Sequence, residues 1–366
     1  MRVALITYST KPRGGVVHTL NLAEALSAQG ADVTVWSLAR QGDTGFFRTV
    51  DPSVALRLLD FPERAGETVT DRIVRSIETL RSRFTPDEYD IVHAQDCISA
   101  NAVGACIRTI HHLDEFTTPI LAECHEKAVV EPYARICVSA AVAADVTAGW
   151  GLHPTVIPNG VRADRYVAAV ADVDGQRRWQ QKLGPYVLAV GGIEPRKGTV
   201  DLVEAYSLVR QHFPDLSLVI AGGETLFDYR DYRGLFEQRC TELAVEPVIL
   251  GAVPDDELPS LVAAADVFAF PSTKEGFGLA AMEALAAGRP VVARELPVLR
   301  EVFGDTVRYA SDPEGFARAM VAAIGDAGRT SAGRALAESL TWETAARSHL
   351  AFYAAHPKPA AGDQLT

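Results

Sequence analysis

Cysteine is scarce in this sequence, and long apolar runs are missing. The 366 residues include 5 cysteines, an odd number with no Cys-x-x-Cys spacing, which favours reduced and mostly buried thiols. No segment approaches the roughly 20 consecutive apolar residues that are needed to cross a bilayer. The apolar run near the N-terminus is shorter than a signal-peptide core and has no cleavage-site pattern. We therefore expect a soluble protein of the cytoplasm.

Basic residues are also fewer than acidic ones. Lys and Arg number 35 against 47 Asp and Glu, so the formal net charge is −12. This balance argues against nucleic acid as a partner, because affinity for nucleic acid comes mainly from phosphate neutralisation. A local cluster of Arg and Lys can still bind a substrate phosphate. The pair Cys124-His125 has no companion ligand pair nearby, so we predict a packing role for it rather than a metal site.

Short apolar runs alternate with helical patterns along both halves of the chain. In the first half we predict strands over residues 3–8, 32–38, 89–94, 108–111, 135–139 and 155–157, with helices over 18–29 and 70–84. In the second half we predict strands over 186–191, 216–221, 247–250, 266–271 and 290–293, with helices over 199–212, 227–244, 255–264 and 279–287. Such alternation with continuous apolar strands indicates parallel sheets covered on both faces.

Length and pattern together predict an α/β protein with two Rossmann-like, doubly wound parallel-sheet domains that face a central cleft. We place the first domain at residues 1–165 and the second at 166–341. The pattern weakens and charge rises over residues 163–184, where we expect the interdomain linker. The polar, Pro- and Ala-rich residues 357–366 are typical of a disordered tail.

Two loops of the second half carry the chemistry of a phosphate site. Gly191-Gly192 allows close approach of a ligand to the backbone, and Arg196-Lys197 supplies a planar fork of donors beside a mobile charge. Gly276-Phe277-Gly278 lies directly before a predicted helix, whose N-terminus can bind a phosphate. A solvated turn with surface cations and a tight strand–helix turn are the plainer interpretations of the two loops.

Two glutamates flank the second of these turns. Glu275 lies in the predicted loop, and Glu283 lies on the following helix among Leu279, Met282 and Leu285. A carboxylate in such apolar surroundings needs a partner, and a ribose diol would supply one. An exposed helix glutamate is the alternative.

The sequence from Pro271 to Ala293 resembles the retaining GT-B glycosyltransferases of family 4. It reads Pro-Ser-x-x-Glu-Gly-Phe-Gly-Leu-x-x-x-Glu-Ala-Leu-Ala-x-Gly-x-Pro-Val-Val-Ala. Further segments follow in the order that the family shows, namely Gly14-Gly15, Val138-Ser139, Pro158-Asn159-Gly160-Val161, Gly191-Gly192, Lys197-Gly198, Ile220-Ala221-Gly222-Gly223, Leu250-Gly251-Ala252-Val253 and Trp342-Glu343. The resemblance covers nearly the whole chain. It also implies that a terminal helix, residues 342–355, packs back on the first domain.

The resemblance assigns roles to these positions. Glu283 would hold the donor ribose, and Glu275 would face the transferred sugar. Arg196 and Lys197 would stabilise the leaving diphosphate, whereas Gly251 and Val253 would line the nucleobase. The residues implied for donor binding are Gly15, Gly192, Arg196, Lys197, Gly251, Val253, Glu275, Gly276, Phe277, Gly278, Leu279 and Glu283, and those implied for catalysis are His111, Glu275, Arg196 and Lys197.

Three features of the first half have more than one interpretation. The family often has Thr-x-His-Asp where this chain has Thr109-Ile110-His111-His112, so His111 or His112 would contact the donor sugar, and we favour His111. Lys11 and Arg13 either meet an anionic acceptor or are plain surface charge. The basic run Arg72, Arg75, Arg81 and Arg83 is either a solvated helix face, which we favour, or a dock for an anionic membrane.

The sequence thus predicts a retaining, metal-independent glycosyltransferase that needs no cofactor. Its donor would be a nucleotide sugar, UDP-linked in preference to GDP-linked, and its acceptor is not indicated. A nucleotide-sugar epimerase of the same fold and a non-catalytic nucleotide-sugar binding protein are the alternatives. A phosphorylase fits less well, because it would need a lysine for pyridoxal phosphate and a longer chain. A dinucleotide-dependent oxidoreductase also fits less well, because the first strand is followed by Gly14-Gly15 and not by Gly-x-Gly-x-x-Gly.

Overall fold

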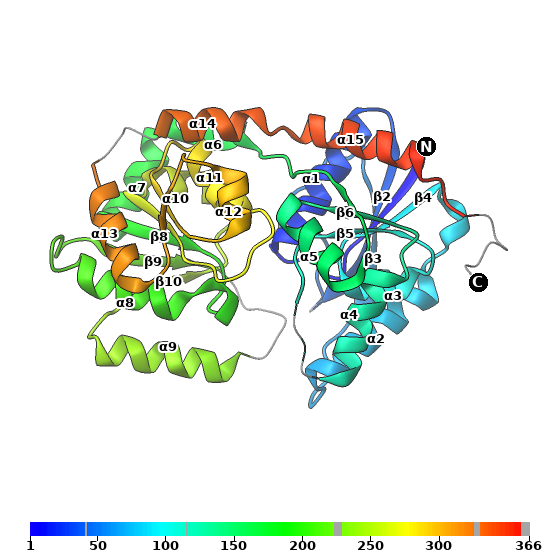
Figure 1. Cartoon of the computed structure of the whole chain (residues 1–366), viewed down its shortest axis with the longest axis horizontal. Coiled ribbons are helices and arrows are strands. Elements are labelled where there is room, and N and C mark those ends of the chain that lie inside the picture. Colours follow the sequence, from blue (N-terminus) through cyan, green and yellow to red (C-terminus); the bar gives the residue numbers. More distant parts are fainter. Residues whose placement is uncertain (41, 115, 117, 223–228, 326–329, 360–366) are drawn as a thin grey trace. The chain divides into compact units, whose positions relative to one another are not determined.

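The computed structural model describes residues 1–40, 42–114, 116, 118–222, 229–325 and 330–359. The chain divides into two compact units. Unit 1 comprises Met1–Gly160 together with the chain from Trp342 onward, and unit 2 comprises Val161–Thr341. Each unit is built on a parallel sheet with helices, so the predicted α/β class is confirmed (Figure 1). Most of the predicted tail, from residue 360 on, lies outside the described residues.

The sheet of unit 1 has seven described strands in the order β3-β2-β1-β4-β5-β6-β7, with every neighbouring pair parallel. The central strands are runs of apolar residues with no exposed surface, as Val3 to Ile6 illustrate. The strands are β1 (Arg2–Ile6), β2 (Asp32–Arg40), β3 (Ala55–Phe61), β4 (Ile91–Ala94), β5 (Ile107–Ile110), β6 (Ala134–Cys137) and β7 (Thr155–Val156). Strand β3 was not predicted from the sequence, because it is an edge strand with a largely exposed, charge-bearing pattern.

The helices of unit 1 include one from the far end of the chain. They are α1 (Gly14–Ala28), α2 (Val69–Arg83), α3 (Cys97–Val103), α4 (Pro119–Val130), α5 (Ala140–Trp150) and α15 (Trp342–Ala355), with a 3₁₀ turn over Pro86–Glu88. Helix α15 packs against α1 (Figure 1). Its buried residues, which include Trp342, Ala345, Ala346, His349 and Tyr353, recur at three- and four-residue spacing and so form one apolar face.

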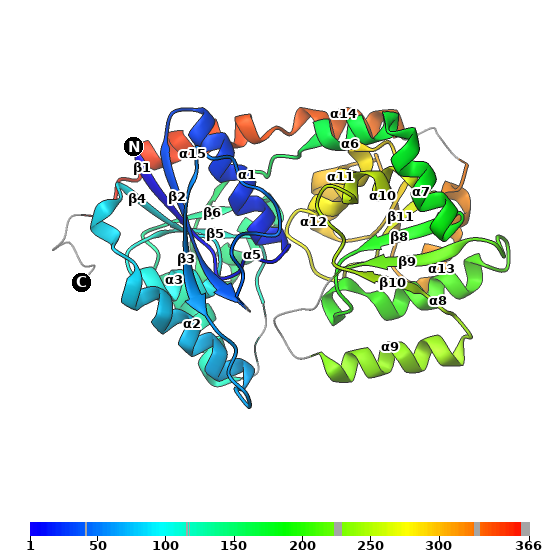
Figure 2. The same ribbon diagram turned by 180° about the vertical axis from the view of Figure 1, so that it is seen from behind.

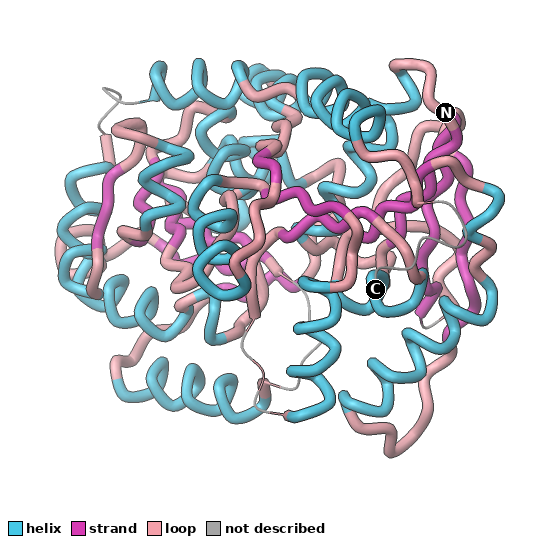
Figure 3. Tube along the Cα trace, turned by 45° about the vertical axis from the view of Figure 1, so that its right-hand side comes forward, coloured by secondary structure: helices cyan, strands magenta, loops and turns pink. Residues whose placement is uncertain are grey.

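Unit 2 repeats this plan with a six-stranded parallel sheet in the order β10-β9-β8-β11-β12-β13. Its strands are β8 (Tyr186–Val190), β9 (Ser217–Ala221), β10 (Val248–Gly251), β11 (Val267–Phe270), β12 (Val291–Arg294) and β13 (Arg308–Ala310). Its helices are α6 (Ala163–Ala171), α7 (Val173–Leu183), α8 (Thr199–Val209), α9 (Arg230–Glu242), α10 (Leu258–Ala264), α11 (Leu279–Ala286), α12 (Pro297–Phe303), α13 (Pro313–Ala323) and α14 (Thr330–Ser339), with a 3₁₀ turn over Pro195–Lys197. In Figure 3 the strands run between layers of helices.

The predicted linker over residues 163–184 is wrong, because α6 and α7 occupy it. Both helices are amphipathic, with charge on one face and Tyr166, Trp179 and Leu183 buried on the other. The rise in charge that suggested a linker therefore belongs to the solvent faces of two packed helices.

The strand order of each sheet reverses once. In unit 1 the reversal lies between β1 and β4, and in unit 2 it lies between β8 and β11. In doubly wound sheets, ligands bind beyond the carboxyl ends of the strands at this switch point. The loops after β8 and β11 therefore occupy the expected ligand-binding position of unit 2, and they are the loops in which the sequence placed Arg196, Lys197 and Glu275.

Helix α15 is attached to unit 1 partly through buried histidines. His93 on β4 lies 2.8 Å through Nδ1 from the hydroxyl of Tyr353 and 2.7 Å through Nε2 from Thr109 Oγ1. The ring centroid of His349 is 5.8 Å from that of His93 and 6.1 Å from that of His18. Burial lowers the pKa of His349 to about 4, and burial together with the charge of His349 lowers the pKa of His18 to about 3.

The lowered pKa values of these histidines predict that the protein loses stability as the pH falls. Their folded-state pKa values lie below the unfolded value of about 6.5, so below that pH the unfolded chain binds protons that the folded chain does not. Stability is therefore fully present above pH 6.5 and falls as the pH drops toward 4, by about 1.4 kcal/mol per pH unit for each group. Thermal unfolding of the intact chain between pH 7.5 and 5 should show this slope. His349→Leu should make it shallower, by roughly 2–4 °C per pH unit. The exposed control His153→Asn should keep the wild-type slope, and an unchanged slope in His349→Leu would contradict the assignment.

Candidate active site

The two loops at the switch point of unit 2 are locked together by backbone contacts. The N–H of Thr273, in the loop after β11, donates to the carbonyl of Arg196, in the loop after β8, at 2.8 Å. Gly198 adopts φ +61°, and a Cβ at this position would lie 2.3 Å from the carbonyl oxygen of Pro271. Only glycine permits this approach. The contact places the basic pair directly beside the glutamate loop.

Glu275 is held by cations from the neighbouring loop. Its Oε1 lies 2.6 Å from Lys197 Nζ and 3.3 Å from Arg196 Nη1, and its side chain is 10% exposed. Arg196 Nη2 also pairs with Glu194 Oε1 at 2.9 Å. Burial alone would raise the pKa of Glu275, but the charges of Lys197 and Arg196 outweigh it and lower the pKa to about 2. Glu275 is therefore an ionised carboxylate throughout the physiological range.

The turn before α11 presents backbone N–H groups at the same edge of the sheet. Gly278 caps the helix with φ +94°, and a Cβ there would lie 2.7 Å from Phe303 Cζ. Ala281 and Met282 donate the first helical hydrogen bonds to the Gly278 carbonyl, so the N–H groups before them are left at the helix N-terminus. Gly276, Phe277 and Leu279 flank this cap, and the side chain of Phe277 is buried. The arrangement suits an anion.

Glu283 lies on α11, which packs against α6. The hydroxyl of Tyr166 hydrogen-bonds to its carboxylate, and the charge of Arg165 acts on it. Arg165 in turn pairs with Asp255 at 2.8 Å. Burial raises the pKa of Glu283 to about 7, against the opposing effects of Tyr166 and Arg165. Glu283 therefore titrates near neutrality, unlike Glu275.

Tyr166, Arg165 and Asp255 were not predicted as site residues. Tyr166 and Arg165 lie on α6, in the stretch that the sequence analysis assigned to a linker. The amphipathic spacing of α6, with Ala163, Tyr166 and Ala169 buried, was the signal that would have identified a packed helix.

The remaining predicted residues of unit 2 lie at the carboxyl ends of β8 and β10, the two strands on either side of β9. Gly192 lies in the loop after β8, next to Gly191. This loop packs closely against the loop after β9, because a Cβ on Gly222 would lie 2.1 Å from the Gly191 carbonyl oxygen. Gly251 ends β10 with φ +69°, and Val253 follows it, partly exposed. These three therefore lie at the same edge of the sheet as Glu275.

Unit 1 brings Gly15 and His111 together. Gly15 belongs to the first turn of α1 and not to a loop before it, because the helix begins at Gly14 instead of near His18. A Cβ on Gly15 would lie 3.7 Å from Nε2 of His111, which follows β5. That nitrogen is buried and has no hydrogen-bond partner in the part of the chain that the structure describes. His112 instead pairs with Asp114 at 3.2 Å.

His111 is kept neutral by its surroundings. Its ring packs edge-on against that of His18, with centroids 4.7 Å apart. Burial, followed by the charges of His18 and Arg108, lowers the pKa of His111 well below its usual value. An uncharged imidazole with an unpartnered nitrogen is suited to hydrogen-bonding a sugar hydroxyl.

The chain has one Asp-x-Asp sequence that was not identified from the sequence, Asp172-Val173-Asp174, and its carboxylates cap and pair within α7. The side chain of Asp172 accepts a hydrogen bond from the N–H of Gly175, and Asp174 pairs with Arg177. The ring of His125, next to Cys124, packs edge-on against Phe116 and Trp150. Among the described residues no group of three or more His, Cys, Asp or Glu side chains is arranged to hold a metal ion.

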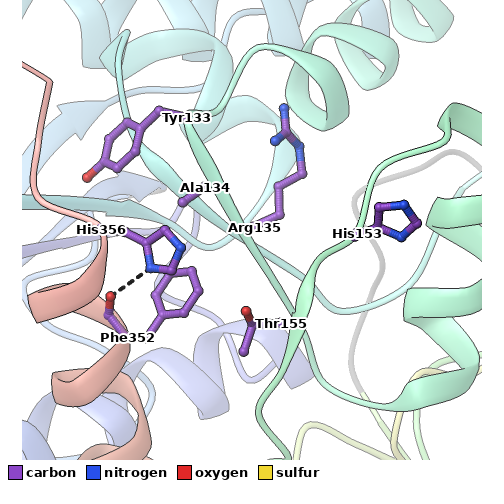
Figure 4. A pocket seen from close by; sticks show the side chains of 7 residues that line it. All are labelled: Tyr133, Ala134, Arg135, His153, Thr155, Phe352 and His356. Atoms are coloured by element: carbon purple, nitrogen blue, oxygen red, sulfur yellow. Dashed lines mark hydrogen bonds between the residues drawn. The ribbon is translucent and has the colours of Figure 1, made fainter.

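A shallow pocket lies at the opposite edge of the unit 1 sheet, at the amino ends of β6 and β7. Figure 4 shows the side chains that line it, namely Tyr133, Ala134, Arg135, His153, Thr155, Phe352 and His356. None of the candidate site residues lines this pocket. The described residues also include no helix that is both long and apolar enough to span a membrane.

The chain is similar to known proteins over both units. A family model described as "Glycosyl transferases group 1" matches residues 176–330, and one described as "Glycosyltransferase Family 4" matches residues 12–165. The phosphatidyl-myo-inositol mannosyltransferase of Mycobacterium tuberculosis is 30% identical over 83% of this chain and 80% of its own length.

Solved structures show the same fold. A sucrose-phosphate synthase from Thermosynechococcus elongatus matches with a TM-score of 0.78 and 20% identity, covering 97% of this chain and 98% of its own. HepE from Anabaena, solved with UDP and glucose, matches with a TM-score of 0.73 and 19% identity, covering 97% and 100%.

The pairing of Glu275 predicts the effect of removing its nearest cation. Lys197→Met leaves a nearly buried carboxylate with Arg196 alone, so the pKa of Glu275 should rise and the chain should lose stability. Removing one partner of a fully buried pair costs about 3–5 kcal/mol, and the second cation and partial exposure reduce this to roughly 2 kcal/mol. Thermal or urea unfolding measures the loss. Lys182→Met, an exposed lysine of the same unit, is the matched control, and equal stability of the two variants would show that the pair is unimportant.

Proposed function

Because the chain belongs to the group 1 glycosyltransferases and has the GT-B fold, we propose that it transfers a hexose from a nucleoside-diphosphate sugar to an acceptor with retention of the anomeric configuration. The observation that carries the donor assignment is the cluster of Lys197, Arg196 and Glu275 beside the N-terminus of α11. These groups lie at the switch point of the unit 2 sheet, where such sheets bind nucleotides.

The chemistry of transfer explains why this cluster suits the reaction. Breaking the bond between the anomeric carbon and the diphosphate oxygen leaves negative charge on the nucleoside diphosphate. Arg196, Lys197 and the N–H groups around Gly278 would stabilise that charge in the transition state. Arg196 has five N–H donors and Lys197 has three, so both can bind phosphate oxygens while they hold Glu275. We therefore propose transfer without a metal ion.

The other site residues would each contact a different part of the donor. Glu275 would accept hydrogen bonds from the transferred sugar, and Glu283 from the ribose diol. Gly192, Gly251 and Val253 would contact the nucleotide through the loops after β8 and β10. Unit 1 would contribute Gly15 and the neutral imidazole of His111.

Comparisons support a hexose and favour UDP as the nucleotide. Several relatives, among them that of Mycobacterium tuberculosis, are named as mannosyltransferases, and the HepE structures hold UDP with glucose or UDP-glucose. Five free cysteines fit a reducing compartment, which supports a cytoplasmic location.

A screen of nucleotide sugars tests the donor assignment. UDP-glucose should raise the melting temperature more than GDP-mannose or ADP-glucose at equal concentration. A ligand present at a hundredfold excess over its Kd stabilises by about 2.7 kcal/mol. Lack of stabilisation by every nucleoside diphosphate would refute the donor assignment.

Two alternatives are separated by the products formed. An epimerase of the same fold would convert the donor without any acceptor, and a non-catalytic binding protein would leave it intact. Incubation with donor alone, followed by chromatography of the nucleotide sugar, identifies the first case. With an acceptor present, NMR of the product tests retention through the anomeric configuration of the transferred sugar.

The raised pKa of Glu283 predicts that donor binding depends on pH. With a pKa of about 7, its carboxyl becomes protonated at slightly acid pH and loses its ability to accept two hydrogen bonds from a diol. Affinity for UDP-glucose, whose diphosphate has no proton that titrates in this range, should fall as the pH drops from 8 to 6, by at most about tenfold per unit. Calorimetry should show a flat profile for Glu283→Gln and the wild-type profile for Glu275→Gln. A flat wild-type profile would disprove the role of Glu283.

A further inference from the structure

The last residue of β12 is an arginine that is nearly buried. Arg294 ends the strand, and its side chain is 11% exposed. Strand β12 lies between β11 and β13, so Arg294 is at the same edge of the unit 2 sheet as the loop that carries Glu275. Its guanidinium carbon is 5.5 Å from the ring centroid of Phe316, which is buried on α13. A buried guanidinium is costly unless its N–H groups have acceptors.

The acceptors of Arg294 come from three different segments. Its Nε donates to the carbonyl of Pro271, after β11, at 2.8 Å, and its Nη1 donates to the carbonyl of Ser311, after β13, at 2.9 Å. Its Nη2 donates to Oδ2 of Asp201, in the first turn of α8, at 2.5 Å. One side chain therefore connects the loops after two strands with the start of the helix that follows a third strand, β8.

The first of these acceptors is the carbonyl at which the two loops of the candidate site meet. A Cβ on Gly198 would lie 2.3 Å from the Pro271 carbonyl oxygen and 3.3 Å from Nη2 of Arg294. Arg294 thus packs against the Gly198 turn and binds the carbonyl that lies beside it. The hydrogen bond from Thr273 to Arg196 lies two residues further along the same loop.

Asp201 extends this connection to the basic loop. Helix α8 begins at Thr199, directly after Gly198, and the 3₁₀ turn over Pro195–Lys197 precedes both. Helices α8 and α13 pack against each other and share one core with the sheet of unit 2 (Figure 2). Arg294 therefore joins the start of α8, and with it the turn that carries the basic pair, to the end of β12.

The position of Lys197 depends on how these loops are arranged. Its Nζ lies 2.6 Å from Oε1 of Glu275 and 5.5 Å from the ring centroid of Phe270, at the end of β11. Its aliphatic chain passes Gly191, where a Cβ would lie 3.2 Å from Cε of Lys197. The attraction between two charges weakens as they separate, so movement of one loop against the other would weaken this ion pair.

We propose that Arg294 is a positioning residue for the donor site. It holds the basic turn and the Glu275 loop in the arrangement in which Lys197 and Arg196 reach the diphosphate of the nucleotide sugar. All three nitrogens of its guanidinium already donate to the protein, so it acts through the basic pair and not by contact with the donor. The inference rests on the proposed function, because the site that Arg294 positions is the donor site.

A purely structural arginine would stabilise unit 2 without affecting the donor, and Arg289 provides that comparison. Arg289 precedes β12 at its amino end, and it is also partly buried. It donates to the carbonyl of Ala287 at 3.3 Å and to that of Ala265 at 3.5 Å, and neither residue belongs to the candidate site. The two arginines thus lie at opposite ends of one strand, and Arg294 is the one of the two that contacts the site loops.

Calorimetric titration of the intact chain and its variants with UDP-glucose tests the proposal. Arg294→Met should weaken binding about tenfold, a typical coupling between interacting residues, whereas Arg289→Met should bind within about twofold of wild type. In the Lys197→Met background, Arg294→Met should weaken binding by less than about threefold, because the charge that Arg294 positions is already gone. Wild-type affinity in Arg294→Met, or the full effect in both backgrounds, would overturn the proposal.

Two milder variants replace Arg294→Met if that variant does not fold. Arg294→Lys keeps the charge but cannot donate to all three acceptors in the same geometry, so it should bind UDP-glucose more weakly than wild type. Asp201→Asn leaves both hydrogen bonds to carbonyls and removes the charge that holds the start of α8, so it should also weaken binding. Wild-type affinity in both variants would contradict the role of Arg294.

Urea unfolding separates this proposal from the donor assignment. Lys197→Met should cost less stability in the Arg294→Met chain than in wild type, because the pair with Glu275 is already loosened, and Arg289→Met should leave that cost unchanged. If UDP-glucose does not bind to wild type but this coupling is found, the donor assignment fails and the positioning of Lys197 by Arg294 stands. If UDP-glucose binds and the two losses are additive in both measurements, the proposal fails and the donor assignment stands.

Discussion

A carboxylate that is nearly buried needs opposite charge within reach, and Glu275 obtains it from a different loop. Lys197 and Arg196 follow β8, and Glu275 follows β11, the strand on the other side of the switch point. The pairing requires the two loops to touch, and Gly198 permits this by leaving the Pro271 carbonyl unobstructed. The position of the α11 N-terminus, the orientation of the basic pair and the ionisation of Glu275 all depend on this contact.

The two glutamates differ because their partners differ. Glu275 has two cations close by and a pKa of about 2, whereas Glu283 has a tyrosine hydroxyl and a more distant arginine and a pKa of about 7. One turn and one short helix therefore hold one carboxylate that is always charged and one that changes charge near neutrality. In the proposed function the first faces the reacting sugar and the second holds the ribose.

The sequence predicted the parts of the fold that local pattern determines. Buried strands such as β1 and β8 are continuous apolar runs, and the glycines before α11 signalled its start. Tyr166 and Arg165 were missed because a charged amphipathic helix resembles a linker when its buried face is short. The proximity of Gly15 to His111 depends on the sheet order, because the two residues follow different strands, β1 and β5.

Unit 1 is made of two stretches of chain that are separated by the whole of unit 2. Helix α15 supplies the buried residues Trp342, His349 and Tyr353. The two stretches pack closely where they meet, because a Cβ on Gly160 would lie 2.3 Å from the backbone nitrogen of Trp342. On the ribosome, α15 emerges after all of unit 2 has been synthesised. Unit 2 can therefore complete its core as a continuous segment, while unit 1 still lacks the helix that packs against α1. The order of folding during synthesis should thus be the reverse of the order in the chain, with the first half of the protein finishing last.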